Sequence, residues 1–133
     1  MNRYAFSGLL LMLMCGTGVS AEKKRVAIAD LVGDWNGTSL CQVKSSPCHD
    51  EQVVFRLSHP QQEKIRVQAD KIVDGKAVTM GPDDWPFDAL SQALIYEIPS
   101  GTWKLIVQGN EMNGTLITRD NVLFRKVHLD RSK

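Results

Sequence analysis

The chain has 133 residues, with 16 Lys and Arg against 15 Asp and Glu, and a formal net charge of +1. This even balance, without a basic run interleaved with aromatic residues, argues against nucleic acid as a partner. A short basic start precedes an uncharged apolar run over 4–14 and small residues over 19–21. The run is too short to span a bilayer and no second one follows. This layout is typical of a bacterial export signal cleaved after Ala21. We therefore expect a signal peptide over 1–21 and one periplasmic or secreted domain over 22–133.

The three cysteines have different expected roles. Cys15 lies in the export signal, and Met14 before it is not the small residue that lipoprotein processing needs. Cys41 and Cys48 remain in the exported chain, where an even pair in an oxidising compartment predicts one disulfide. A metal site needs more thiols or well-spaced histidines, so we expect neither a metal nor another cofactor.

The rest of the chain reads as short segments with apolar residues at every second position, which is typical of half-buried strands. A short helical turn over 26–31 comes first. The expected strands then lie at 34–42, 51–58, 64–73, 76–81, 85–90, 93–98, 102–108, 111–118 and 121–129. Asp74-Gly75 is a strong two-residue hairpin turn, and His59-Pro60 is expected to end a strand. The fourth and fifth strands are alternatively one strand broken at Gly81-Pro82.

Eight or nine short strands joined by tight turns predict an all-β fold. Closing the sheet removes exposed strand edges, and consecutive hairpins close most simply as an antiparallel up-and-down barrel. A β-sandwich is the alternative. We favour the barrel because the sequence shows no long crossover connection.

Gly33-Asp34-Trp35, a G-x-W at the start of the first strand, resembles the opening motif of the calycins, which include lipocalins, fatty-acid-binding proteins and avidin-like barrels. The resemblance implies that Trp35 closes one end of the barrel and that a basic side chain of the last strand packs across its ring. Arg125, on the face shared by Leu123 and Val127, is the matching position. Both implied roles are structural, and no ligand-contacting residue carries over.

The histidines give little support for an enzyme. His49-Asp50-Glu51 could bind a metal or relay a proton, but neighbouring residues on a strand point to opposite faces, so we expect a polar turn beside the disulfide. His59 is a loop residue, and His128 lies on the outer face of the last strand. No nucleophile, metalloprotease or phosphate-loop motif is present in the sequence. We therefore expect a protein without catalytic residues.

The segment over 83–88 is the most unusual part of the chain, because Trp85 and Phe87 stand among three aspartates beside a proline. A polar-rimmed binding patch often has this composition, so we expect at least one of the two rings to be partly exposed at a barrel end. The alternative is that both rings join the core. Tyr96 is a further candidate inside the barrel, whereas Trp103 is expected in the core.

Two functions follow from these expectations. The first is an exported binder of a small apolar or amphipathic ligand, with Trp85, Phe87 and Tyr96 as candidate contacts. The alternative is a protein-binding barrel, such as an inhibitor of an exported protease or other hydrolase, since small periplasmic protease inhibitors look similar. A continuous cavity of about 300 Å³ or more favours the ligand binder, and a packed interior favours the second reading.

Overall fold

The computed structural model describes residues 16, 18 and 24–133. Apart from Gly16 and Gly18, the predicted export signal lies outside the described residues, as does its cleavage site after Ala21. Within the described part, no helix is long and apolar enough to cross a membrane. A short 3₁₀ turn, η1 (Ile28–Leu31), occupies the place of the expected helical turn.

The expected strands are all present, with ends that differ by a few residues. They are β1 (Gly33–Cys41), β2 (Glu51–Gln61), β3 (Lys64–Val73), β4 (Lys76–Thr79), β5 (Asp83–Asp88), β6 (Ala93–Ile98), β7 (Gly101–Gln108), β8 (Glu111–Thr118) and β9 (Leu123–Arg131).

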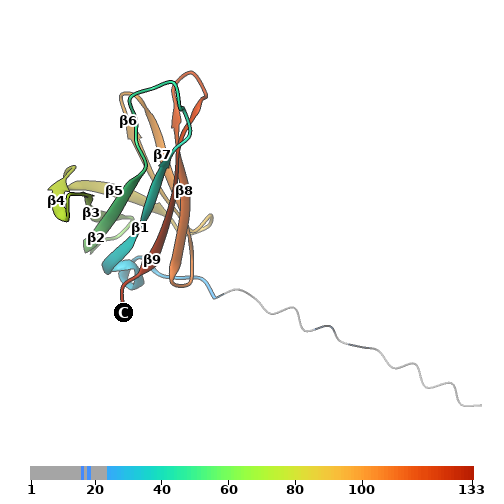
Figure 1. Ribbon diagram of the computed structural model, residues 1–133. Coiled ribbons are helices and arrows are strands. Elements are labelled where there is room, and N and C mark those ends of the chain that lie inside the picture. Colours follow the sequence, from blue (N-terminus) through green and yellow to red (C-terminus); the bar gives the residue numbers. More distant parts are fainter. Residues whose placement is uncertain (1–15, 17, 19–23) are drawn as a thin grey trace, which may run out of the picture.

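The strands form a closed antiparallel barrel, as predicted. Their order in the sheet is β2-β1-β9-β8-β7-β6-β5-β3-β4, and β2 also pairs with β3. This second pairing closes eight strands into a ring and leaves β4 outside it. Figure 1 shows β4 and the turn before it projecting from one side of the barrel. The sandwich alternative is therefore excluded.

β4 and β5 follow one another along the same edge of β3. β4 pairs with β3 at Asp70–Val73, and β5 pairs with it at Lys64–Val67. Between them the Met80 amide donates to the Ala69 carbonyl at 2.7 Å, and Gly81 has a φ of 135° that favours glycine. The two strands are thus one strand broken at Gly81-Pro82, the alternative that the sequence had left open.

The turns and irregularities agree with the sequence except at β2. Asp74 and Gly75 have φ values of 50° and 76°, as a type I′ hairpin turn requires. By contrast, β2 does not end before His59, because it continues to Gln61. The pairing of β2 with β3 shifts register between Ser58 and Gln61, and a bulge of this kind accommodates a proline within a strand.

Trp35 and η1 close one end of the barrel. The Trp35 side chain is 0% exposed, and its indole Nε1 donates to the Leu31 carbonyl at 3.0 Å. Since a buried indole N–H needs an acceptor, this bond fixes the short turn across the barrel end. The fully buried side chains that accompany Trp35 in the core are Leu31, Ile65, Leu94, Leu105, Met112 and Leu129.

The basic side chain across Trp35 is Arg131, so the prediction of Arg125 was wrong. The guanidinium carbon of Arg131 lies 4.3 Å from the Trp35 ring centroid, and its Nη1 donates to the Val32 carbonyl at 3.1 Å. Trp35 is the register partner of Arg131, whereas Arg125 is the partner of Cys41 near the other end of β1. The prediction failed because β9 runs past the expected end at 129, and strand alternation places Arg131 on the same inward face.

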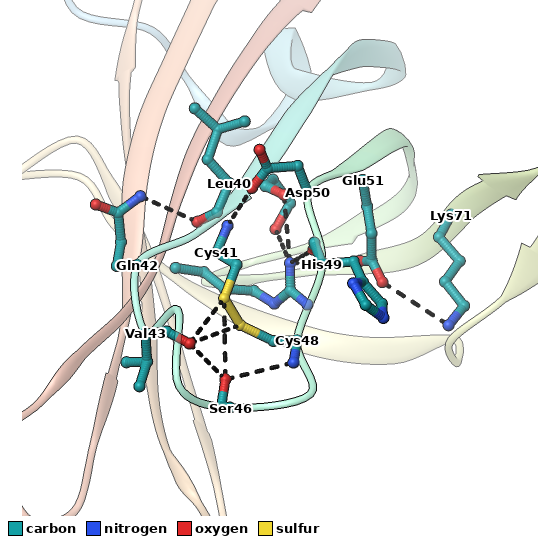
Figure 2. Close-up of polar contacts among 12 residues, drawn as sticks. Leu40, Cys41, Gln42, Val43, Ser46, Cys48, His49, Asp50, Glu51 and Lys71 are labelled. Carbon is teal, nitrogen blue, oxygen red and sulfur yellow. Dashed lines mark hydrogen bonds and ion pairs between the residues drawn. A yellow bond between two sulfur atoms is a disulfide. The ribbon is translucent and has the colours of Figure 1, made fainter.

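The predicted disulfide joins Cys41 at the end of β1 to Cys48, with Cα atoms 5.9 Å apart. The loop that it closes is tightened by Ser46, whose hydroxyl donates to the Val43 carbonyl at 2.7 Å and accepts from the Cys48 amide at 3.3 Å (Figure 2). A structural disulfide is a mark of an oxidising compartment.

We predict that Trp35 is energetically coupled to Arg131 and not to Arg125. Trp35→Ala should cost about 3–5 kcal/mol in unfolding free energy, the usual range for a buried large aromatic side chain. Double-mutant cycles from urea unfolding, with Trp35→Leu combined with Arg131→Gln, should give a coupling of about 0.5–2 kcal/mol. The matched cycle with Arg125→Gln should give a coupling near zero, and a larger value there than for Arg131 would contradict the assignment.

We also predict that the disulfide stabilises the fold by about 2.5 kcal/mol, from the closure entropy of a short loop. Unfolding of the natural chain should shift to lower urea on adding reductant. The double variant Cys41→Ser/Cys48→Ser should have the same urea midpoint as the reduced natural chain, and reductant should not change that midpoint. An unchanged midpoint in the reduced natural chain would show that the bond contributes no stability.

Candidate functional site

The half of the barrel away from Trp35 is hollow. A cavity of about 400 Å³ lies there, lined by side chains of β1, β2, β3, β5, β6, β7 and β9 and by Met80. The core side chains Leu31, Leu94 and Met112 do not line it. The barrel therefore has one filled end and one end with room for a small molecule.

Four aromatic rings form one wall of this cavity, with Trp85 at their centre. The Trp85 and Tyr96 rings are stacked, with centroids 5.0 Å apart and an interplanar angle of 11°. Trp103 lies 6.4 Å from Trp85 in a tilted arrangement, and Phe55 meets it edge-on at 6.1 Å. These geometries are the ones that aromatic pairs prefer, so the wall is a preformed apolar surface.

The stack forms because β5 and β6 separate toward the open end. They pair only at Phe87 with Leu94 and at Asp88 with Ala93. The Phe87 amide donates to the Glu63 carbonyl, toward β3, at 2.7 Å. Backbone amides alternate in direction along a strand, so the nitrogen of Pro86 faces β6, where it has no hydrogen to donate. The Trp85 and Tyr96 side chains lie on the inner face beside this unpaired stretch.

Two of the three predicted ligand contacts meet in the cavity. Trp85 and Tyr96 line it, but Phe87 does not. The expectation that Trp85 or Phe87 would be partly exposed was wrong, since they are 5% and 6% exposed. Both rings point inward, while Asp84 and Asp88 occupy the alternate, exposed positions of β5. Asp84 and Asp88 therefore belong to the outer face of the barrel and do not surround the aromatic rings.

A charged cluster around Glu51 also lines the cavity. Its carboxylate is 3.6 Å from Nη1 of Arg125 and 3.8 Å from Nζ of Lys71. The Arg125 side chain is only 12% exposed, and its Nη1 also donates to the Ser39 carbonyl, the Ser39 hydroxyl and the His49 carbonyl at 3.3, 3.2 and 3.0 Å. Arg125 thus anchors the disulfide loop to the cavity wall.

The residues after Cys48 form a polar connection beside the disulfide, as expected, although the turn itself lies earlier, at Lys44 and Ser45. Asp50 accepts from the Cys41 amide at 2.8 Å, and His49 is exposed. His128 also faces outward, where its Nδ1 lies 2.7 Å from the Asn113 side-chain oxygen. Within residues 16, 18 and 24–133, no three His, Cys, Asp or Glu side chains gather as a metal site.

Tyr96 and Asp83 form a polar contact at the edge of the aromatic wall. Burial raises the pKa of the Tyr96 phenol above its ordinary value, and the neighbouring Asp83 carboxylate raises it further. The phenol therefore stays protonated at neutral pH and can donate a hydrogen bond.

Lys71, Ser39 and Trp103 are cavity residues that sequence reasoning missed. Lys71 continues the inward face of Ile65, Val67 and Ala69, so a charge at an inward position was the available signal. Trp103 was expected in the core. It does pack against buried side chains, but it also lines the cavity.

Comparison with known proteins supports the fold. No family model and no curated protein matches the sequence. A redesigned beta barrel has a TM-score of 0.61 at 15% identity, covering 80% of this chain and 96% of that chain. The siderocalin Ex-FABP, described as functioning through dual ligand specificities, has a TM-score of 0.50 at 11% identity, covering 77% and 71%. The chain therefore has a calycin-like, eight-stranded antiparallel barrel, similar in fold to a lipocalin.

Proposed function

We propose that this protein is an exported, non-catalytic binder of a small apolar or amphipathic molecule. The observation that carries the proposal is the cavity of about 400 Å³ behind the aromatic wall. This volume falls in the range of ligand pockets, about 300–1,000 Å³. A cavity of this size favours a ligand binder over an inhibitor of an exported hydrolase, for which a packed interior is expected.

The lining of the cavity suits an amphipathic ligand. Apolar groups would lie against the buried side chains of Val53, Phe55 and Val67, where water is excluded. Polar groups would face the side chains that supply hydrogen-bonding oxygens, which include Ser39, Glu51 and Asp83.

The Cys41–Cys48 disulfide supports an exported protein, because such bonds persist in oxidising compartments.

We predict that an uncharged apolar dye such as N-phenylnaphthylamine binds in the cavity and that filling the cavity abolishes binding. Ala69 lines the cavity, so Ala69→Phe should weaken dye binding at least about tenfold, a loss of about 1.4 kcal/mol. The readout is dye fluorescence, together with energy transfer from tryptophan.

The matched control is Ala77→Phe, the same substitution at an exposed position of β4 that does not line the cavity. It should leave dye binding unchanged. Thermal melting of both variants separates loss of the site from loss of the fold. Equal binding by the two variants, or no binding by the natural chain, would refute a cavity ligand.

A further inference from the structure

The charges that line the cavity are not evenly compensated. Four charged side chains line it: Glu51, Lys71, Asp83 and Arg125. Glu51 lies within 4 Å of both Lys71 and Arg125. By contrast, no cationic side chain of the described residues lies within ion-pair distance of Asp83. Asp83 therefore offers an uncompensated negative charge at the cavity.

This carboxylate lies beside the aromatic wall. Asp83 is two residues before Trp85 on the same face of β5, and Trp85 stacks on Tyr96 at 5.0 Å. Asp83 also raises the pKa of Tyr96, after the larger effect of burial. Aromatic faces carry negative electrostatic potential and attract cations within about 6 Å. A carboxylate and several rings thus attract the same kind of group.

The charged cluster around Glu51 is less suited to capture an anion. The Arg125 guanidinium already donates to Ser39 and His49 and lies beside Glu51. An anion there would compete with these contacts and would approach the Glu51 carboxylate. The Lys71 ammonium lies 3.8 Å from the same Glu51 carboxylate, which offsets part of its charge.

We propose that the ligand is an organic cation, an amine or a quaternary ammonium with an apolar remainder. Its charged group would lie between Asp83 and the rings of Trp85, Tyr96 and Trp103, and its apolar part would enter the cavity. This inference rests on the proposed function, because it assigns the ligand class of the same cavity.

The test compares three probes that share a phenyl ring and differ in charge: benzyltrimethylammonium, benzyl alcohol and phenylacetate. Each displaces N-phenylnaphthylamine from the natural chain, and the ratio of their affinities is the readout. We expect the cation to bind at least about tenfold more tightly than the anion, equivalent to about 1.4 kcal/mol, and more tightly than the neutral alcohol.

Two neighbouring substitutions test whether Asp83 sets this preference. Asp83→Asn removes the charge with little change in shape and should bring the cation-to-anion ratio toward one. Asp84→Asn is the matched control, since Asp84 is exposed on the outer face of β5 and pairs with Arg66 at 3.0 Å. It should keep the ratio of the natural chain. Because the readout is a ratio, a general loss of cavity affinity cancels.

The outcomes separate this inference from the proposed function. If the dye binds but phenylacetate competes as well as the cation, the cationic ligand class is wrong and the cavity binder stands. If the natural chain prefers the cation but Asp83→Asn keeps the ratio, the role assigned to Asp83 is wrong. If the dye does not bind the natural chain, both proposals fail.

Discussion

The placement of Trp35 at one end of the barrel determines how the rest of the interior is used. The ring is fully buried, hydrogen-bonded to Leu31 and covered by the guanidinium of Arg131. A large aromatic side chain fills much of the narrow space inside an eight-stranded barrel. The η1 turn and the end of β9 both contact the Trp35 ring, through Leu31 and Arg131 respectively. The closed end is therefore packed with side chains, and the cavity lies at the other end of the barrel.

The open end owes its character to the separation of β5 from β6. A continuous ladder between them would bring the strands to the usual spacing of about 4.8 Å. Pro86 has no backbone N–H to donate toward β6. The pairing between β5 and β6 stops beyond Phe87 and Leu94. The Trp85–Tyr96 stack lies on the inner face beside this unpaired stretch. The same irregularity thus disrupts the sheet and builds the aromatic wall.

The other wall is organised by the disulfide loop. The bond between Cys41 and Cys48 holds a short loop next to the cavity, and Arg125 reaches from β9 to the His49 carbonyl within it. Burying an arginine is costly unless its donors are satisfied, and Ser39, His49 and Glu51 provide acceptors here. Arg125 was expected to cover Trp35, but it acts at the opposite end of the barrel.

Local patterns in the sequence determined the fold class, the strand positions and the disulfide, because period-two alternation, turn residues and cysteine spacing act within a few residues. The tertiary structure decided which basic residue covers Trp35, since that depends on the register between β1 and β9 and on where β9 ends. It also decided that Phe87 joins the core while Trp85 and Tyr96 share a cavity. Whether the barrel is filled or hollow depends on how side chains from seven strands pack together in three dimensions. A local pattern along the chain does not contain that information.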